Sequence, residues 1–304
     1  MRWQVAAPLA LTVVLVACAT SPEAQLSRAE RHSERAIVEL AKRTDADSLA
    51  AAGLLSVQRH RDQSVALFDR ALAASPARVD LVWLQAQNCR AAPPCDPEPM
   101  ERRLRELDPA NGAGWLGALA RADSQNDTEA KDAALAALGR SQRVDVYWTT
   151  LIVGLSRAVA QTKTMSLSEA EVVIIGLLAA QALPTYGVAS NACKGERLQR
   201  VEVTEICRGV AQAFERGDTY ITEMIGIAIA KRVWPEQSVE WRAASDARRV
   251  LEYRSRLSAK QEIDWSNAHA AETYLALCSE NHREQDVSRA LLIRAGLRPD
   301  PPAD

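Results

Sequence analysis

Residues 47–76, DSLAAAGLLSVQRHRDQSVALFDRALAASP, decide the fold class of the chain. Small and apolar residues recur at intervals of three or four, first over positions 49–57 and again over positions 65–72. That spacing places them on one face of a helix, and the polar residues 59–62 between the two runs are typical of a turn. Pro76 ends the second run, because proline lacks the amide hydrogen that a helix interior needs. The stretch therefore predicts two antiparallel helices joined by a short turn.

A second proline closes another helix at a similar interval. Pro109 follows Pro76 by 33 residues, and tetratricopeptide repeats have a period of about 34 residues. The positions that match this repeat are Phe68, Ala71, Pro76, Trp115 and, two residues out of register, Trp83. The middle unit departs from the pattern, since two cysteines and three prolines replace its inter-helix turn. The chain from 47 to 139 resembles tetratricopeptide repeats, which implies stacked helix pairs with a concave surface.

The remainder of the chain continues the helical pattern. Ser168 and Glu171 have the spacing of a capping box and open the apolar run 172–180, which predicts a central, buried helix that ends before Pro184. Further helices are expected over 196–216, 219–234, 238–257, 258–280 and 284–295. The predicted fold is all-α: stacked antiparallel helix pairs, a tetratricopeptide-like solenoid, over 47–165, a C-terminal helical bundle over 166–296 and a disordered tail over 297–304.

The N-terminal segment has the features of a secretory signal. Arg2 precedes an apolar run over positions 5–16, which is too short for a hydrocarbon core that needs roughly 20 residues. The run ends in Leu15-Val16-Ala17-Cys18, which resembles the lipobox of bacterial lipoproteins. The resemblance implies removal of residues 1–17 and attachment of lipid, palmitate included, to Cys18. Residues 18–46 then form a tether and a first helix. The alternative is a plain secretory signal cut near Ala19.

The resemblance also implies a location. Ala19 follows the cysteine where a signal for inner-membrane retention usually has aspartate, so the expected site is the outer membrane, with the protein facing the periplasm of a Gram-negative envelope. Two or more acyl chains anchor a protein stably, whereas one holds it only marginally. No second apolar run is expected to span a membrane, because the longest, 172–180, has only about half of the length required.

Composition excludes one large class of partners. The chain has a formal net charge of −2 and therefore lacks the basic excess with which proteins displace counterions from nucleic acids. Its content is 47% hydrophobic but only 5% aromatic, and good helix formers predominate, as an all-α protein requires. The expected partners are therefore the membrane, through the lipid on Cys18, and a protein or peptide of the envelope.

The cysteines are typical of an oxidising compartment. Cys18 aside, the chain contains Cys89, Cys95, Cys193, Cys207 and Cys278. Sequence alone does not fix their connectivity. We expect the neighbours to pair, Cys89 with Cys95 and Cys193 with Cys207, and Cys278 to be a buried free thiol. Pairs of Cys-x-x-Cys knuckles are absent from the sequence, so no metal site is predicted.

Catalytic motifs are weak. Residues 112–117, GAGWLG, match the G-x-G-x-x-G pattern, but a helix precedes them where a dinucleotide site needs a strand. They are therefore interpreted as the start of a repeat helix. His269 and Glu272 lie one helical turn apart without an evident third ligand. We therefore predict no enzyme, no catalytic residue and no cofactor.

One charged pattern remains as a candidate interaction surface. Arg242, Arg249 and Arg256 recur every seven residues and so share one face of a helix. Such a stripe can meet lipid phosphates or an acidic partner. Asp246 and Glu252 alternate with it, and this alternation favours the simpler interpretation of a solvated, salt-bridged face.

The leading functional hypothesis is a membrane-anchored periplasmic binding or scaffolding lipoprotein that docks a protein or peptide on the concave face of its repeats. The first alternative is a periplasmic enzyme, or a regulator of a cell-wall enzyme, which needs a polar cluster in a pocket between the two helical halves. The second is a structural envelope protein without a specific partner.

Overall fold

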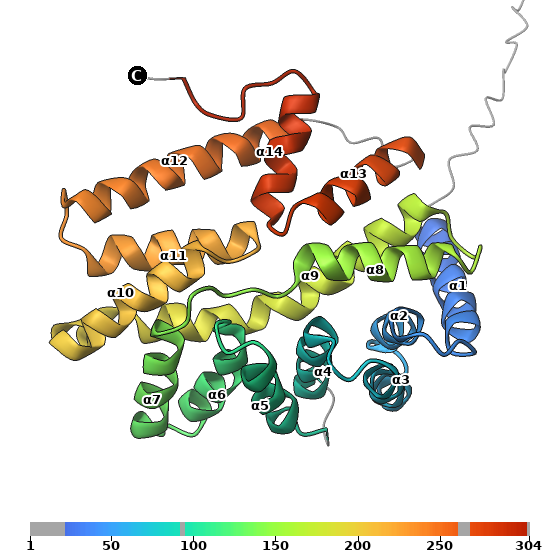
Figure 1. The fold of residues 1–304 in the computed structure, drawn as a ribbon, viewed down its shortest axis with the longest axis horizontal. Helices are drawn as coiled ribbons and strands as arrows, with labels where there is room; N and C mark the ends of the chain where they lie inside the picture. The colour runs from blue at the N-terminus through green and yellow to red at the C-terminus, as the bar shows by residue number, and fades with distance from the viewer. Residues whose placement is uncertain (1–21, 92–94, 261–267, 303–304) are drawn as a thin grey trace, which may run out of the picture.

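The computed structural model describes residues 22–91, 95–260 and 268–302, and these residues form helices without any β-strand. The all-α prediction is confirmed, as are the stacking of helix pairs and their continuation into a C-terminal group of helices (Figure 1). Most buried apolar side chains form one cluster that extends from Ala36 to Leu275 and is continuous across the predicted boundary at 165, and Leu277, Cys278 and Val287 form a small second cluster.

The first part of the chain consists of one leading helix and three helix pairs. The leading helix is α1 (Pro22–Leu40), which packs on α2, and the pairs are α2 (Ala46–Ser56) with α3 (Arg61–Ala74), α4 (Val79–Ala91) with α5 (Glu98–Leu107) and α6 (Ala113–Ser124) with α7 (Thr128–Gly139). In the first pair, Phe68 is fully buried and lies directly over Gly53, where an added Cβ would come within 3.0 Å of its ring. A small residue on one helix thus lets the aromatic ring of its partner approach closely.

The second part begins with two long apolar helices. Its elements are α8 (Trp148–Ala160), α9 (Leu167–Ala192), a short 3₁₀ helix (Gly195–Gln199), α10 (Val201–Glu215), α11 (Tyr220–Val233), α12 (Val239–Lys260), α13 (Ala268–Glu280) and α14 (Glu284–Arg294). The helix predicted over 196–216 is thus divided in two. The helix predicted over 258–280 is also wrong at its start, since α12 reaches Lys260 and α13 begins at Ala268; positions 261–267 lie outside the described residues.

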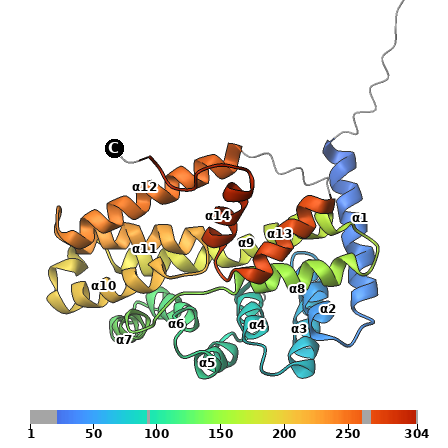
Figure 2. The same cartoon turned by 45° about the horizontal axis from the view of Figure 1, so that its top comes forward.

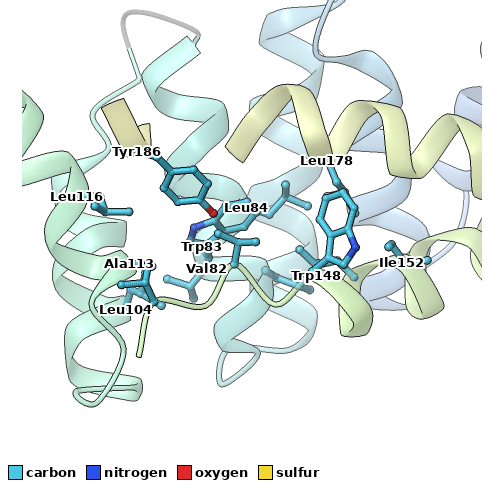
Figure 3. Packing of buried hydrophobic residues seen from close by; sticks show 14 of the residues in the cluster. Val82, Trp83, Leu84, Leu104, Ala113, Leu116, Trp148, Ile152, Leu178 and Tyr186 are labelled. Carbon is cyan, nitrogen blue, oxygen red and sulfur yellow. The ribbon is translucent and has the colours of Figure 1, made fainter. Parts of the chain in front are cut away.

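Helix α9 lies along the inner helices of the three pairs. It packs on α2, α4 and α6, and also on α8, α11 and α13 (Figure 1). Tyr186 of α9 lies near Trp83 and Leu84 of α4, and Leu178 of α9 lies beside Trp148 of α8 (Figure 3). A helix of the same chain thus covers the face formed by α2, α4 and α6, and docking of a partner on the repeats stays a prediction.

The ends of α9 differ from those predicted. Ser166, not Ser168, caps the helix: its hydroxyl accepts a bond from the Glu169 amide at 3.2 Å, and the Glu169 carboxylate accepts one from the Ser166 amide at 2.8 Å. The helix also continues past Pro184 to Ala192. With 26 residues, α9 is long and apolar enough by length and composition to cross a membrane, contrary to the expectation of no such run. Helices of the same chain pack on it from several sides, but Val172 is 47% exposed, so the prediction of a helix buried on all sides over 172–180 is wrong.

The tail after α14 makes a defined contact. Arg254 on α12 donates to the Pro299 carbonyl at 3.1 Å and pairs with Asp300 at 2.6 Å. The expectation of a disordered tail over 297–304 is therefore wrong for this part, because an ion pair and a backbone hydrogen bond fix it to α12.

A polar pocket between the two parts as candidate functional site

A pocket of about 450 Å³ lies where the repeats meet the C-terminal helices. Its walls come from three connections: the segment between α7 and α8, the turn between α10 and α11, and the turn between α13 and α14. We call it the arginine pocket, and its lining residues are Arg143, Asp145, Tyr147, Thr149, Thr150, Arg216, Asp218, His282 and Arg283.

Asp218 joins the three connections. It is only 4% exposed, and its two carboxylate oxygens accept hydrogen bonds from the backbone amides of Val146 at 2.9 Å and Trp148 at 2.8 Å. Its carbonyl oxygen accepts a bond from the Glu284 amide at 2.8 Å. Burial, followed by the charge of Asp145, raises the pKa of Asp218 to about 7, although both amide bonds favour its charged form. The side chain thus acts as the N-terminal cap of α8 from a distant part of the sequence.

Close approach of two backbones makes this arrangement possible. A Cβ atom on Gly217 would lie 2.5 Å from the Val144 carbonyl oxygen, so no side chain fits beside Asp218 at that position. Across the contact, Tyr147 has a φ of 58°, in the left-handed region that non-glycine residues seldom adopt. The two amides that bind Asp218 flank this residue. The carboxylate therefore stabilises a costly backbone turn.

A second set of bonds fixes the Tyr147 side chain. Its hydroxyl donates to Asp108 at 2.9 Å, and the Asn111 amide donates to the Tyr147 hydroxyl at 3.0 Å and to the Asp145 carbonyl at 2.9 Å. Burial and the charge of Asp108 raise the pKa of Tyr147 above its usual range, so the phenol is neutral at physiological pH. The repeats and the α7–α8 connection are thus joined by hydrogen bonds at the edge of the pocket.

Three guanidinium groups line the same pocket. Arg143 pairs with Asp108 at 2.7 Å and with Asp145. Arg283 donates to the Gly217 and Glu215 carbonyls and pairs with Glu223, each at 3.1 Å. Arg216 is exposed, and its Nε donates a hydrogen bond to the Gln142 carbonyl at 2.6 Å.

These contacts define what the pocket can do chemically. Both oxygens of Asp218 are committed to backbone amides, so this carboxyl group positions the walls and is poorly placed to exchange a proton with a ligand. Burial raises the pKa of Asp145 against the lowering effect of Arg143. Arg216, in contrast, presents an exposed guanidinium group with donors to spare. The geometry suits binding of an anionic group more than acid–base catalysis.

The residues predicted from sequence lie elsewhere. The Cα atoms of Cys89 and Cys95 are 4.7 Å apart, and those of Cys193 and Cys207 are 5.6 Å apart, so both expected pairs are within disulfide-bonding distance. Cys278 is a buried free thiol, as expected. Cys18 lies outside the described residues. Gly112 precedes α6, so the glycine motif does start a repeat helix.

The predicted basic stripe lies on the exposed side of α12. Arg242, Arg249 and Arg256 are exposed, and Arg249 lies 3.8 Å from Asp246, while Arg248 pairs with Glu252 at 2.7 Å. Ion pairs within the helix favour the solvated face over a dedicated site. None of the three arginines lines the arginine pocket.

A second polar group lies where α9 packs on α13. Glu171 is fully buried, and neither of its carboxyl oxygens has a hydrogen-bond partner in the described part of the chain. Burial, followed by the charge of Glu272, raises its pKa to about 8. Burial also raises the pKa of the nearby Cys278 thiol to about 12, so this thiol is neutral and unreactive. Sequence reasoning assigned Glu171 to a helix cap and missed this burial.

Among the described residues, no three His, Cys, Asp or Glu side chains gather closely enough to hold a metal ion. Stacked helix pairs with an inner helix and a polar inter-part pocket define an all-α helical-repeat class of protein. This class rests on the fold alone. No family model, curated protein or solved structure matches the chain.

Proposed function

We propose that this protein is a membrane-anchored periplasmic lipoprotein that binds a protein or peptide partner, with an acidic group of the partner in the arginine pocket. The observation that carries the proposal is the meeting of Arg143, Arg216 and Arg283 in one pocket of about 450 Å³. Guanidinium groups bind carboxylates through two parallel hydrogen bonds, which gives both orientation and selectivity. The fixed backbone around Asp218 keeps these walls in place before a ligand arrives.

The sequence supports the membrane anchor. The lipobox ends at Cys18, and α1 begins at Pro22. Four residue steps span at most about 14 Å of extended chain. A lipid that anchors Cys18 in the outer membrane therefore holds the start of α1 close to the bilayer. The two cysteine pairs at bonding distance suit the oxidising periplasm on the same side.

Substituting Cys18→Ala is expected to leave the protein uncleaved or soluble, because neither acylation nor signal removal by this route can proceed without the thiol. Membrane fractionation and intact-mass measurement check the result, with Cys278→Ala as the matched control. Wild-type membrane attachment and mass in the Cys18→Ala protein would contradict the lipid anchor.

Substituting Arg216→Gln is expected to weaken binding of the blocked peptide acetyl-AAEAA-amide by at least threefold, because one exposed guanidinium group at the pocket is lost. Fluorine NMR of protein labelled with 5-fluorotryptophan measures the affinity through the resonance of Trp148, assigned with Trp148→Phe. Arg242→Gln on α12 is the matched control and should bind as the wild type does. Equal binding of acetyl-AAQAA-amide, or an unaffected Arg216→Gln protein, would defeat the pocket as the site.

A further inference from the structure

A second concavity lies next to the arginine pocket and has the opposite charge. We call it the alanine groove. It follows α11 between α10 and α12, three helices that lie side by side in both ribbon views (Figure 2), and has a volume of about 310 Å³. Its lining residues are Gln212, Glu215, Glu223, Ile227, Ala230, Trp234, Glu240, Ala243, Ala244 and Ala247.

The groove combines an apolar floor with a negative rim. Alanine side chains leave room along α11 and α12, and Trp234 presents an aromatic surface beside them. Three carboxyl groups and no basic side chain belong to the lining. Glu223 pairs with Arg283, but no described side chain pairs with Glu215 or Glu240. Burial and the charge of Glu223 raise the pKa of Glu215, against the lowering effect of Arg216, while Glu240 lies exposed at the rim.

The linings of the groove and of the arginine pocket contain neighbouring residues. Glu215 lines the groove and its neighbour Arg216 lines the pocket, while the pair between Glu223 and Arg283 at 3.1 Å joins the two walls. Opposite charges therefore stand next to each other at the C-terminal end of α10. A ligand that lies across this boundary meets guanidinium groups on one side and carboxyl groups on the other.

We infer that the alanine groove binds a basic side chain of a peptide, lysine or arginine, beside the acidic group that enters the arginine pocket. The methylene stem of such a side chain covers apolar surface while its charged end remains near water. The alanine floor accepts the stem, and the rim carboxylates pair with the charged end. Arg208 already lies over one face of the Trp234 ring, 4.1 Å from its centroid, so a ligand meets only the remaining surface of that ring. As a subsite for the same partner, the groove rests on the proposed function, but it can be tested alone.

The test uses acetyl-AARAA-amide and its citrulline analogue, which keeps the shape of arginine and lacks the charge. Protein labelled with 5-fluorotryptophan reports binding through the Trp234 resonance, assigned with Trp234→Phe. The arginine peptide should shift this resonance with an affinity at least threefold higher than that of the citrulline peptide. Equal affinities would overturn the inference.

Variants then locate the site. Glu240→Gln and Glu215→Gln should each weaken binding of the arginine peptide by threefold to tenfold. Glu236→Gln, an exposed carboxylate nearby that does not line the groove, should have no effect. Unchanged binding in both groove variants would also overturn the inference. The arginine peptide tests the groove and acetyl-AAEAA-amide tests the arginine pocket, so failure of the arginine pocket and failure of the groove are separate results.

Discussion

Replacing Asp218 with alanine is expected to lower the free energy of unfolding by about 3 kcal/mol, since an unsatisfied buried amide costs roughly 1–3 kcal/mol and two are left. The carboxylate holds the amides of Val146 and Trp148 at 2.9 Å and 2.8 Å in a site that is 4% exposed. Loss of these bonds also releases the left-handed turn at Tyr147. Urea denaturation followed by circular dichroism measures the change.

Two further variants make the Asp218 result specific. Asp218→Asn keeps one acceptor and turns a donor towards the second amide. We therefore expect it to lower the free energy of unfolding by an amount similar to that of Asp218→Ala. Asp246→Ala removes a 72% exposed carboxylate of α12 and should change stability by less than about 1 kcal/mol. If Asp218→Ala proved as stable as Asp246→Ala, the three connections would not depend on this side chain.

Replacing Glu171 with glutamine is expected to stabilise the protein in alkaline solution and to have little effect in acid. Burial raises the pKa of Glu171 from its usual 4.5 to about 8 in the folded protein. The folded state therefore binds this proton more tightly than the unfolded state, and stability falls as the pH rises from 4.5 to about 8. Above that window, the cost of the buried charge reaches up to roughly 5 kcal/mol, since one pKa unit corresponds to about 1.4 kcal/mol.

Glutamine is neutral at every pH and escapes that cost. We therefore expect Glu171→Gln to exceed the wild type in free energy of unfolding by at least about 2 kcal/mol at pH 9 and to match it within about 1 kcal/mol at pH 4. Urea titrations at pH 4, 6 and 9 test the difference, with exposed Glu106→Gln as the control. A constant difference across the three pH values would show that Glu171 is not titrating in the fold.

The helices were predictable because each one carries its own signal. Apolar residues at helical spacing and the prolines at 76 and 109 define the first pairs without knowledge of their neighbours. The start of α9 was predicted two residues too late, because Ser166 and Glu169 have the same capping spacing as Ser168 and Glu171. A local pattern that occurs twice does not show which serine caps the folded helix.

The candidate site was not predictable for the same reason. Arg143, Arg216 and Arg283 lie in three connections separated by more than 60 residues each, and only the packed fold brings them together. The left-handed conformation of Tyr147 has no local signal, since tyrosine rarely adopts it. Gly217-Asp218-Thr219 does carry the mark of a turn before a helix, but the amides that Asp218 caps belong to α8, some 70 residues earlier in the chain.

Because α9 lies along α2, α4 and α6, its length limits the number of helix pairs whose inner face it can cover. Its 26 residues extend about 39 Å at a rise of 1.5 Å per residue, and neighbouring helices pack about 8–10 Å apart. Three such helices side by side span only about 16–20 Å between their outer axes, so α9 is long enough to cover the inner face of all three pairs. Open solenoids gain or lose units by duplication and deletion of a repeat. In this chain, a unit added beyond the reach of α9 would leave its own inner apolar face uncovered, so the length of α9 limits how far the array can be extended.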